Sequence, residues 1–340
     1  MKRVLLAAAL VLSMVFITAC GSSSEDSKKS SDGDTLKTGF AVTSSVENSK
    51  DAGKEDGLAQ TDSTAFGVLV DSDGVIVKCV IDSAQTKINF SKEGKLLTPL
   101  DKPVPTKYEL GDDYGLHKAS SLGKDWKDQI TAFCDYVQGK TLDEVKGISV
   151  DEKTAPKDEE LASSVTIKIG GFIEGLDKAV SDAKDRGAKK GDTLGLGIVT
   201  RIDKSKDAGA EDGLAQANSS YALASFNGDG QVTSCVIDGS QSNLNFNSQG
   251  KFTSDLTAPQ KTKAGMGDDY GMKAKSGIGK EWYEQSAAYS DYVLGKTEKE
   301  ITDVAVNKEG SPADPELASS VTISVGDFNG CITKAFNMAR

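Results

Sequence analysis

Acid–base chemistry in this sequence would have to come from carboxylates, because histidine is almost absent. Two pairs of neighbouring acids each occur twice: Glu55-Asp56 and Glu211-Asp212, and Asp112-Asp113 and Asp268-Asp269. A general acid or base works in a sheltered cleft, whereas each of these pairs adjoins a glycine, as residues in exposed turns do. His117 is the only histidine, which excludes a multi-histidine metal site. We therefore do not expect a hydrolase, and we predict no metal site.

Hydroxyl side chains form the second candidate site. Residues 161–166 read Leu-Ala-Ser-Ser-Val-Thr, and residues 317–322 repeat the same six types. An amphipathic helix is expected directly after each stretch, and hydroxyls at a helix entrance, together with unpaired backbone N–H groups, can bind a phosphate. The candidate residues are Ser163, Ser164 and Thr166 in the first stretch and Ser319, Ser320 and Thr322 in the second. The alternative is that the serines only cap the helix.

Both candidates occur twice because the chain contains an internal duplication. Four segments recur, always 156 positions later: 50–60 as 206–216, 79–82 as 235–238, 111–115 as 267–271, and 162–167 as 318–323. Units of this size are whole domains rather than solenoid repeats. We assign residues 39–184 to repeat 1, 185–194 to a polar linker and 195–340 to repeat 2, and we expect each repeat to fold on its own. His117 corresponds to Lys273, which excludes a catalytic role common to both repeats.

Each repeat is predicted to place strands first and helices after them. Residues 64–70 and 75–81 are typical of a β-hairpin around an Asp-Gly turn, and the second repeat has the same pattern. Residues 124–137 and 169–183 have the periodicity of amphipathic helices, and Thr141 begins a capping box between them. This order indicates an α+β fold with two homologous domains in tandem, each an antiparallel sheet with C-terminal helices.

Four cysteines lie within the repeats: Cys79 and Cys134 in the first, Cys235 and Cys331 in the second. Cys79 and Cys235 occupy equivalent positions, whereas the other two do not. One disulfide in each repeat is possible in an exported protein, and buried free thiols are the equal alternative.

The N-terminal residues resemble a bacterial lipoprotein signal. A basic pair precedes an apolar stretch that is short for a membrane span, and small residues then lead to Cys20. The resemblance to the lipobox implies a signal peptide over residues 1–19 and a palmitate-type lipid anchor on Cys20, at the extracytoplasmic face of the cell membrane. Residues 20–38 are mostly polar and predict a flexible tether. An ordinary secretory signal with an unrelated cysteine is the alternative.

The Ser-Ser-Val-Thr stretches resemble the signature of a known family, the FMN-binding domain of electron-transfer flavoproteins. That family carries Ser-Gly-Ala-Thr before its last helix, and an exported flavin transferase links FMN to the threonine through a phosphodiester. The resemblance implies that Thr166 and Thr322 carry FMN, that the neighbouring serines bind phosphate oxygens, and that Tyr114 and Tyr270 lie beside the flavin ring. The two middle positions of the signature differ, because serine and valine replace glycine and alanine.

These observations give two hypotheses of different classes. The net charge of −11 disfavours nucleic-acid binding, since that affinity comes from neutralising phosphates. The first hypothesis is a membrane-anchored lipoprotein with two FMN-binding-like domains that carries electrons at the cell surface, with a flavin transferase and redox proteins as partners. The second is a non-catalytic surface lipoprotein whose tandem modules bind a small solute or a partner protein.

Overall fold

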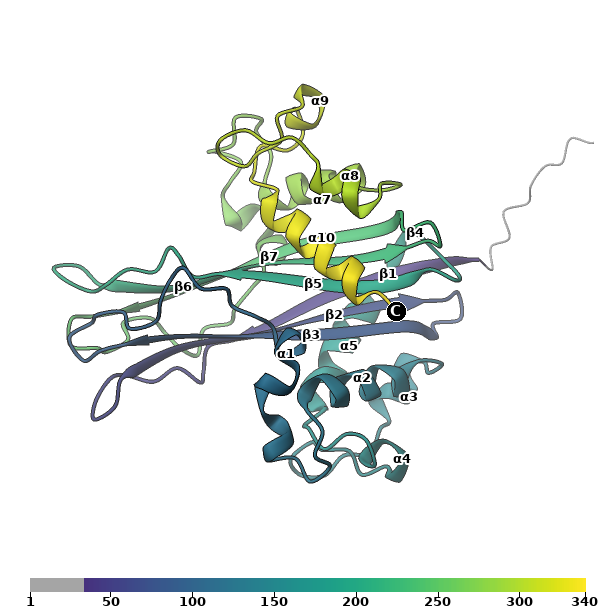
Figure 1. The fold of residues 1–340 in the computed structure, drawn as a ribbon, viewed down its shortest axis with the longest axis horizontal. Coiled ribbons are helices and arrows are strands. Elements are labelled where there is room, and N and C mark those ends of the chain that lie inside the picture. The colour runs from purple at the N-terminus through teal and green to yellow at the C-terminus, as the bar shows by residue number, and fades with distance from the viewer. Residues whose placement is uncertain (1–33) are drawn as a thin grey trace, which may run out of the picture. The chain divides into compact units, whose positions relative to one another are not determined.

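The computed structural model describes residues 34–340 of the chain. The predicted signal peptide, Cys20 and most of the predicted tether lie outside the described residues. The described part confirms the α+β class: there are two antiparallel sheets, and in each repeat the three long strands are followed in the sequence by helices (Figure 1).

The two sheets are built from long hairpins. The first sheet has the order β3-β2-β1-β4 and the second the order β5-β6-β7. Their bounds are β1 Thr35–Ser45, β2 Gly57–Val70, β3 Ile76–Phe90, β4 Lys184–Lys189, β5 Thr193–Arg201, β6 Gly213–Phe226 and β7 Val232–Phe246. The predicted hairpins are confirmed, with Val70 opposite Ile76 and Phe226 opposite Val232. Both hairpins extend further from the turn than predicted. The prediction was too short because polar side chains interrupt the apolar pattern in the outer halves of the strands.

Two segments expected to be flexible are strands instead. β1 begins at Thr35, so residues 35–38 of the predicted tether belong to the sheet, where Leu36 and Thr38 are buried. Half of the predicted linker, residues 185–189, belongs to β4, which pairs antiparallel with β1, and residues 193–194 begin β5. The charged side chains of β4 are those of an edge strand with one exposed face, and the sequence alone does not distinguish such a strand from a linker.

Ten helices and three 3₁₀ turns follow the sheets within residues 34–340. In repeat 1 they are α1 Lys107–Leu110, η1 Gly111–Tyr114, η2 Leu116–Lys118, α2 Trp126–Val137, α3 Leu142–Lys146, α4 Glu159–Ala162 and α5 Gly170–Ser181. In repeat 2 they are α6 Lys263–Met266, η3 Gly267–Tyr270, α7 Trp282–Tyr292, α8 Glu298–Thr302, α9 Pro315–Ala318 and α10 Gly326–Met338. The predicted amphipathic helices are confirmed, and so is the capping box of Thr141 with Glu144. None of the described helices is long and apolar enough to span a membrane.

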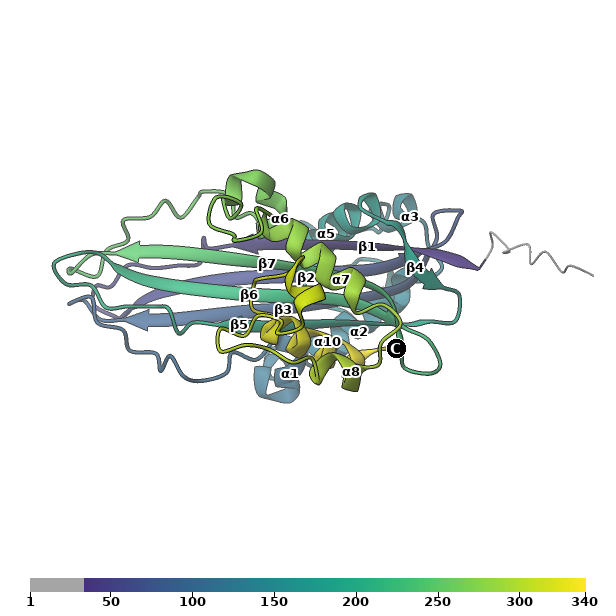
Figure 2. The same cartoon turned by 90° about the horizontal axis from the view of Figure 1, so that it is seen from above.

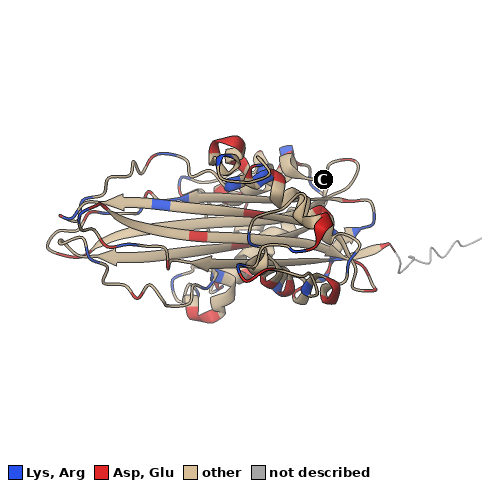
Figure 3. Ribbon diagram, turned by 90° about the horizontal axis from the view of Figure 1, so that it is seen from below, with Lys and Arg blue, Asp and Glu red and all other residues tan. Residues whose placement is uncertain are grey.

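One face of each sheet packs against the helices of its own repeat. α2 and α5 cover the first sheet, and α7 and α10 cover the second, with α7 over β7 and α10 over β5 (Figure 2). In the first sheet a close contact occurs at Gly39, where a Cβ would lie 2.1 Å from the carbonyl oxygen of Ala179 in α5. Gly195 makes the same approach to Ala335 in α10. Charged residues gather on the helices and loops, and few lie on the strands (Figure 3).

The other faces of the two sheets pack against each other. Leu36, Leu69 and Val80 of repeat 1 form one cluster with Leu196 and Leu223 of repeat 2. At the far end of the sheets the rings of Phe90 and Phe246 stack with centroids 4.3 Å apart. Each repeat thus has its own core between sheet and helices, and the two repeats share a further core between the sheets, which the sequence did not predict.

Two reciprocal hydrogen bonds show that this packing follows an approximate two-fold relation. Ala52 N–H donates to Gly250 O, and Ala208 N–H donates to Gly94 O, each at 2.8 Å. Since Ala208 and Gly250 are the counterparts of Ala52 and Gly94, each repeat offers the other the same surface.

All four cysteines of the repeats are free and buried. Burial raises the pKa of the Cys235 thiol to about 12, so this thiol is protonated and unreactive. The structure therefore supports the prediction of buried free thiols and not that of one disulfide in each repeat.

Candidate functional site

A pocket of about 560 Å³ in repeat 1 brings part of the predicted site together. Tyr114 reaches it from η1, and Thr166 reaches it from the loop between α4 and α5. Other side chains that line it are Lys107, Ser120, Trp126 and Phe172. Tyr114 is half-buried and the Thr166 side chain is exposed, so both are open to a ligand. The volume falls within the range of small-molecule sites.

Aromatic rings and a lysine form one wall of this pocket. The Lys107 ammonium lies 5.2 Å from the ring centroid of Tyr114 and 5.8 Å from that of Trp126. Trp126 is only 4% exposed and packs edge-on against Phe172, so it belongs to the core. Tyr114 is therefore the ring that a planar ligand would meet. Lys263 lies over Tyr270 and Trp282 in the same way in repeat 2.

Thr166 is held by a glutamine that the sequence analysis missed. Gln129 of α2 is fully buried, and its Oε1 accepts from Thr166 N–H at 2.8 Å, Thr166 Oγ1–H at 3.1 Å and Ile167 N–H at 3.2 Å. Its Nε2 donates to Ser120 Oγ at 3.1 Å and to the carbonyl oxygen of Lys124 at 3.0 Å. One side chain thus fastens three segments of the chain, and its polar atoms are all satisfied.

Repeat 2 contains the same arrangement around Gln285. Its Oε1 accepts from Thr322 N–H, Thr322 Oγ1–H and Ile323 N–H, and its Nε2 donates to Ser276 Oγ. The signal available in the sequence was a polar residue kept 156 positions apart within an amphipathic helix. Because Gln129 and Gln285 satisfy these N–H groups, the expectation that unpaired donors surround each threonine is wrong.

The four candidate serines lie away from the helix entrance. Ser163 follows α4, and its hydroxyl donates to the carbonyl oxygen of Glu160 at 2.7 Å; Ser319 does the same to Glu316 at 2.6 Å. The N–H groups of Ser164 and Ser320 donate to the leucine three residues earlier. α5 and α10 begin without a side-chain cap. The serines therefore neither cap these helices nor join the threonines in the pocket.

The acidic pair of η1 and the histidine lie beside the pocket. Asp112 and Asp113 are exposed, as a turn predicts, and so are Asp268 and Asp269 in η3. His117 Nδ1 lies against the carboxylate of Asp125, which is buried and also accepts from Leu116 N–H at 2.7 Å. His117 therefore fixes the loop that follows η1.

A buried carboxylate in each repeat was also missed. Asp82 in β3 accepts from the N–H groups of Ser83 at 2.6 Å and Tyr108 at 3.2 Å, and burial raises its pKa to about 7. Burial likewise raises the pKa of its counterpart Asp238. Both aspartates lie in the repeated segments 79–82 and 235–238, and this repetition could have identified them from the sequence. These carboxylates fasten α1 and α6 to the sheets.

Comparisons with known proteins give little further information. No family model and no solved structure matches the chain. Over 42 residues it is 52% identical to a chlorophenol reductase of Desulfitobacterium hafniense. That match covers 12% of this chain and 13% of the other protein, so the similarity concerns one short segment.

Proposed function

We propose that the protein is a lipid-anchored, extracytoplasmic lipoprotein whose first repeat binds a planar, anionic ligand of the FMN class. The observation that carries the proposal is the pocket of Tyr114 and Thr166, which combines an accessible aromatic ring, exposed hydroxyls and lysines. Aromatic faces bind planar rings, and lysines bind phosphate as point charges.

The residues present fit FMN in three respects. Tyr114 offers a half-buried ring to a flavin. Lys107 and Lys168 both line the pocket, so two ammonium groups lie within reach of a phosphate. The exposed Thr166 hydroxyl lies 3.4 Å from Ser120 Oγ, and the two would complete the polar end of the site.

A covalent link through Thr166 is compatible with its hydrogen bonds. An ester at Oγ1 would remove one of the three donors that Gln129 Oε1 accepts. The N–H groups of Thr166 and Ile167 would remain on that oxygen. The loop would thus keep its position while the hydroxyl carries the phosphodiester that the family resemblance implies.

FMN, when bound, would supply reversible electron transfer, and the protein would then be an electron carrier at the cell surface. Repeat 2 is the weaker site in this account. Ser324 replaces Lys168 there, and Asp327 stands in the first turn of α10 where repeat 1 has Gly171. Asp327 pairs with Arg201 at 2.5 Å, so the missing ammonium of Lys168 is the main difference for a phosphate.

The ligand is tested by titrating the lipid-free mature chain with FMN and following flavin fluorescence. We expect saturable quenching that Tyr114→Ala weakens at least about tenfold, the loss of one stacking contact. The matched control is Tyr270→Ala, which leaves the titration unchanged. No saturable binding to the wild type would overturn the ligand class and would favour the alternative, a surface lipoprotein that binds another solute or a partner protein.

The covalent link and the anchor need separate measurements. When the protein is coexpressed with an exported flavin transferase, mass spectrometry should find an FMN-sized addition on the peptide containing Thr166, and Thr166→Val should abolish it. Cys20→Ala should release the protein from membranes, because the two or more acyl chains of the anchor are lost. Retention of that variant in membranes would contradict the lipoprotein assignment.

A further inference from the structure

The approximate two-fold relation creates two equivalent grooves between the repeats. The first groove lies between β3 and α2 of repeat 1 and β5 of repeat 2. The second lies between β7 and α7 of repeat 2 and β1 of repeat 1. Each residue that lines the first groove has its counterpart, 156 positions away, in the lining of the second. We call them the closed groove and the open groove, because their volumes are about 10 Å³ and about 700 Å³.

Smaller side chains account for the difference in volume. Three wall residues of the closed groove have smaller counterparts in the open groove: Tyr108 corresponds to Ala264, Ile130 to Ser286 and Thr131 to Ala287. Glu109, beside the closed groove, corresponds to Gly265. In the closed groove the remaining space is filled by Met338 and Arg340 at the C-terminal end. The open groove lacks the packing contacts that the closed groove makes, and this loss costs stability. The presence of the cavity in one groove alone points to a use for the space.

The open groove also lacks an ion-pair partner that the closed groove has. Lys334 Nζ lies 2.6 Å from Glu109 Oε1 beside the closed groove. Its counterpart Lys178 lines the open groove, but Gly265 stands where the glutamate would be. No carboxylate of residues 34–340 lies within ion-pair distance of Lys178.

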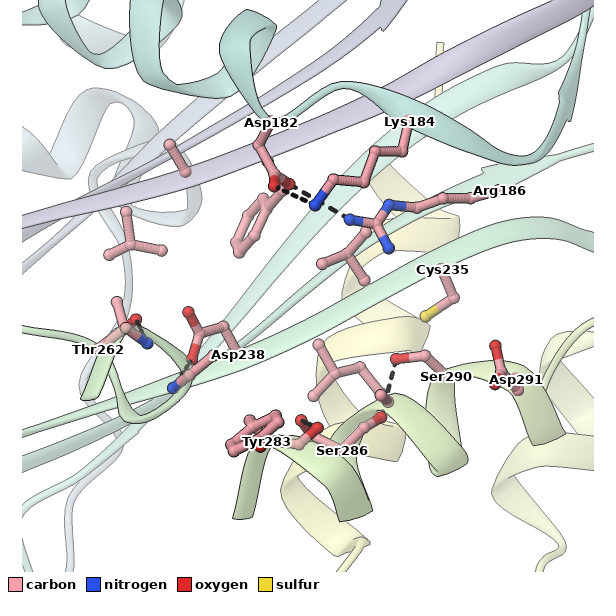
Figure 4. Close-up of a pocket in the computed structure, with 18 of the residues that line it drawn as sticks. Asp182, Lys184, Arg186, Cys235, Asp238, Thr262, Tyr283, Ser286, Ser290 and Asp291 are labelled. Atoms are coloured by element: carbon pink, nitrogen blue, oxygen red, sulfur yellow. Dashed lines mark hydrogen bonds and ion pairs between the residues drawn. The ribbon is translucent and has the colours of Figure 1, made fainter. Parts of the chain in front are cut away.

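A second cationic side chain lines the same groove. Arg186 contributes to this wall, although its Nε is enclosed by protein and is not open to the groove. The same side chain reaches Asp182 through Nη2 at 3.3 Å, beside Lys184, which lies 3.0 Å from that carboxylate. Figure 4 shows this cluster on one side of the groove and Tyr283, Ser286 and Ser290 of α7 on the other.

We propose that the open groove is a binding site for a small aromatic carboxylate. Its ring would occupy the space that Tyr108 fills in the closed groove, above an apolar floor that includes Phe40 and Val236. Its carboxylate would replace that of Glu109 and pair with Lys178, with the positive charge of Arg186 on the same wall. The ligand would thus supply an aromatic ring and a carboxylate, the two groups that Tyr108 and Glu109 provide at the closed groove and that repeat 2 lacks.

The acidic side chains around the groove do not oppose this assignment. Asp182 is paired with Lys184 and Arg186. Asp185 accepts from Gly187 N–H, and Asp238 accepts from the N–H groups of Gly239 and Ala264. Asp291 is exposed, where solvent screens its charge.

Calorimetry with 3-(4-hydroxyphenyl)propanoate tests the proposal on the lipid-free mature chain. We expect one saturable site per chain with a Kd below about 1 mM. The double variant Ala264→Tyr/Gly265→Glu, which restores the walls of the closed groove, should abolish binding. 4-Ethylphenol, which lacks the carboxylate, should bind at least about tenfold more weakly, as expected for loss of a charge-assisted hydrogen bond.

Single lysine variants test the same binding site if the double variant does not fold. Lys178 is exposed, so Lys178→Gln leaves the fold intact and should weaken binding at least about tenfold. Lys334→Gln, the equivalent change at the closed groove, should leave binding unchanged. Absence of saturable binding to the wild type, or equal effects of the two lysine variants, would overturn the proposal.

Discussion

The two repeats agree in their buried polar contacts and differ in the walls of their pockets. Gln129 and Gln285 hold the same groups in the same way, and Asp82 and Asp238 both fasten the first helix to the sheet. Tyr108 and Glu109, in contrast, become Ala264 and Gly265. Substituting one residue of a buried polar network leaves its hydrogen-bond partners unsatisfied, which strongly destabilises the fold. Substituting a pocket wall residue by a smaller one removes packing contacts and creates space for a ligand. The first kind of residue therefore maintains the fold, and the second kind is where a binding function can diverge.

Separating the repeats should have the largest effect. A fragment of residues 193–340 exposes Leu194, Leu196 and Leu223, which repeat 1 covers in the full chain. We expect no cooperative thermal transition for this fragment by circular dichroism, and strong binding of a hydrophobic dye. Residues 34–340, measured in parallel, should unfold in one cooperative transition. A cooperative transition of the fragment would mean that the shared core is dispensable.

Removing the buried glutamine that both repeats share should destabilise each repeat by the same amount. Gln129→Leu leaves the N–H groups of Thr166 and Ile167 without acceptors, which should lower the free energy of unfolding by about 3 kcal/mol. Gln285→Leu should cost about the same. Gln249→Leu in an exposed turn is the control, expected within about 0.5 kcal/mol of the wild type in urea unfolding. Clearly unequal losses at Gln129 and Gln285 would contradict the equivalence of the two networks.

The buried carboxylate of Asp82 should make stability depend on pH. Its pKa is raised to about 7 in the folded protein, against about 4 in the unfolded chain. The folded state therefore binds the extra proton between these values, and stability should fall by about 3 kcal/mol as pH rises from about 4.5 to 7, then level off. Asp82→Asn should remove this component, because an amide oxygen still accepts from Ser83 and Tyr108. Urea unfolding of the variant and the wild type at several pH values measures this contribution. A difference in stability that does not change with pH would exclude a role of Asp82 in the pH dependence.

The helix caps should give the smallest effect. Thr141→Ala and Thr297→Ala each break a capping box of the same geometry. Each should cost about 1 kcal/mol, with the two losses additive because the sites belong to different repeats. Thermal unfolding of the single and double variants measures this, and non-additive losses would indicate coupling between the helix layers.

The sequence predicted the elements with local signals and missed the contacts between the repeats. The Asp-Gly turns, the helix periodicity and the capping boxes depend on neighbouring residues, so hairpins and helices could be predicted. β4 and the start of β1 could not, because an edge strand with charged side chains has the composition of a linker. The uninterrupted apolar run of residues 65–70 indicates a strand buried on both faces, but it does not identify the other repeat as the cover of the second face.

The candidate site could be predicted in part for the same reason. Tyr114 and Thr166 were both selected by their repeated motifs, and the fold brings them into one pocket. The serines beside Thr166 turn toward α4, and Gln129 enters from a helix 37 residues away. Nothing local in the sequence connects that helix to the loop, and only the packing of α2 places the glutamine there.

The number of FMN molecules bound by each chain tests the proposed function most directly. Equilibrium dialysis of the lipid-free mature protein against FMN measures this number without assuming which repeat binds. We expect one FMN per chain, because repeat 1 has Lys168 in its pocket, whereas repeat 2 has Ser324 at this position. Two equivalent FMN molecules per chain, or none, would contradict it.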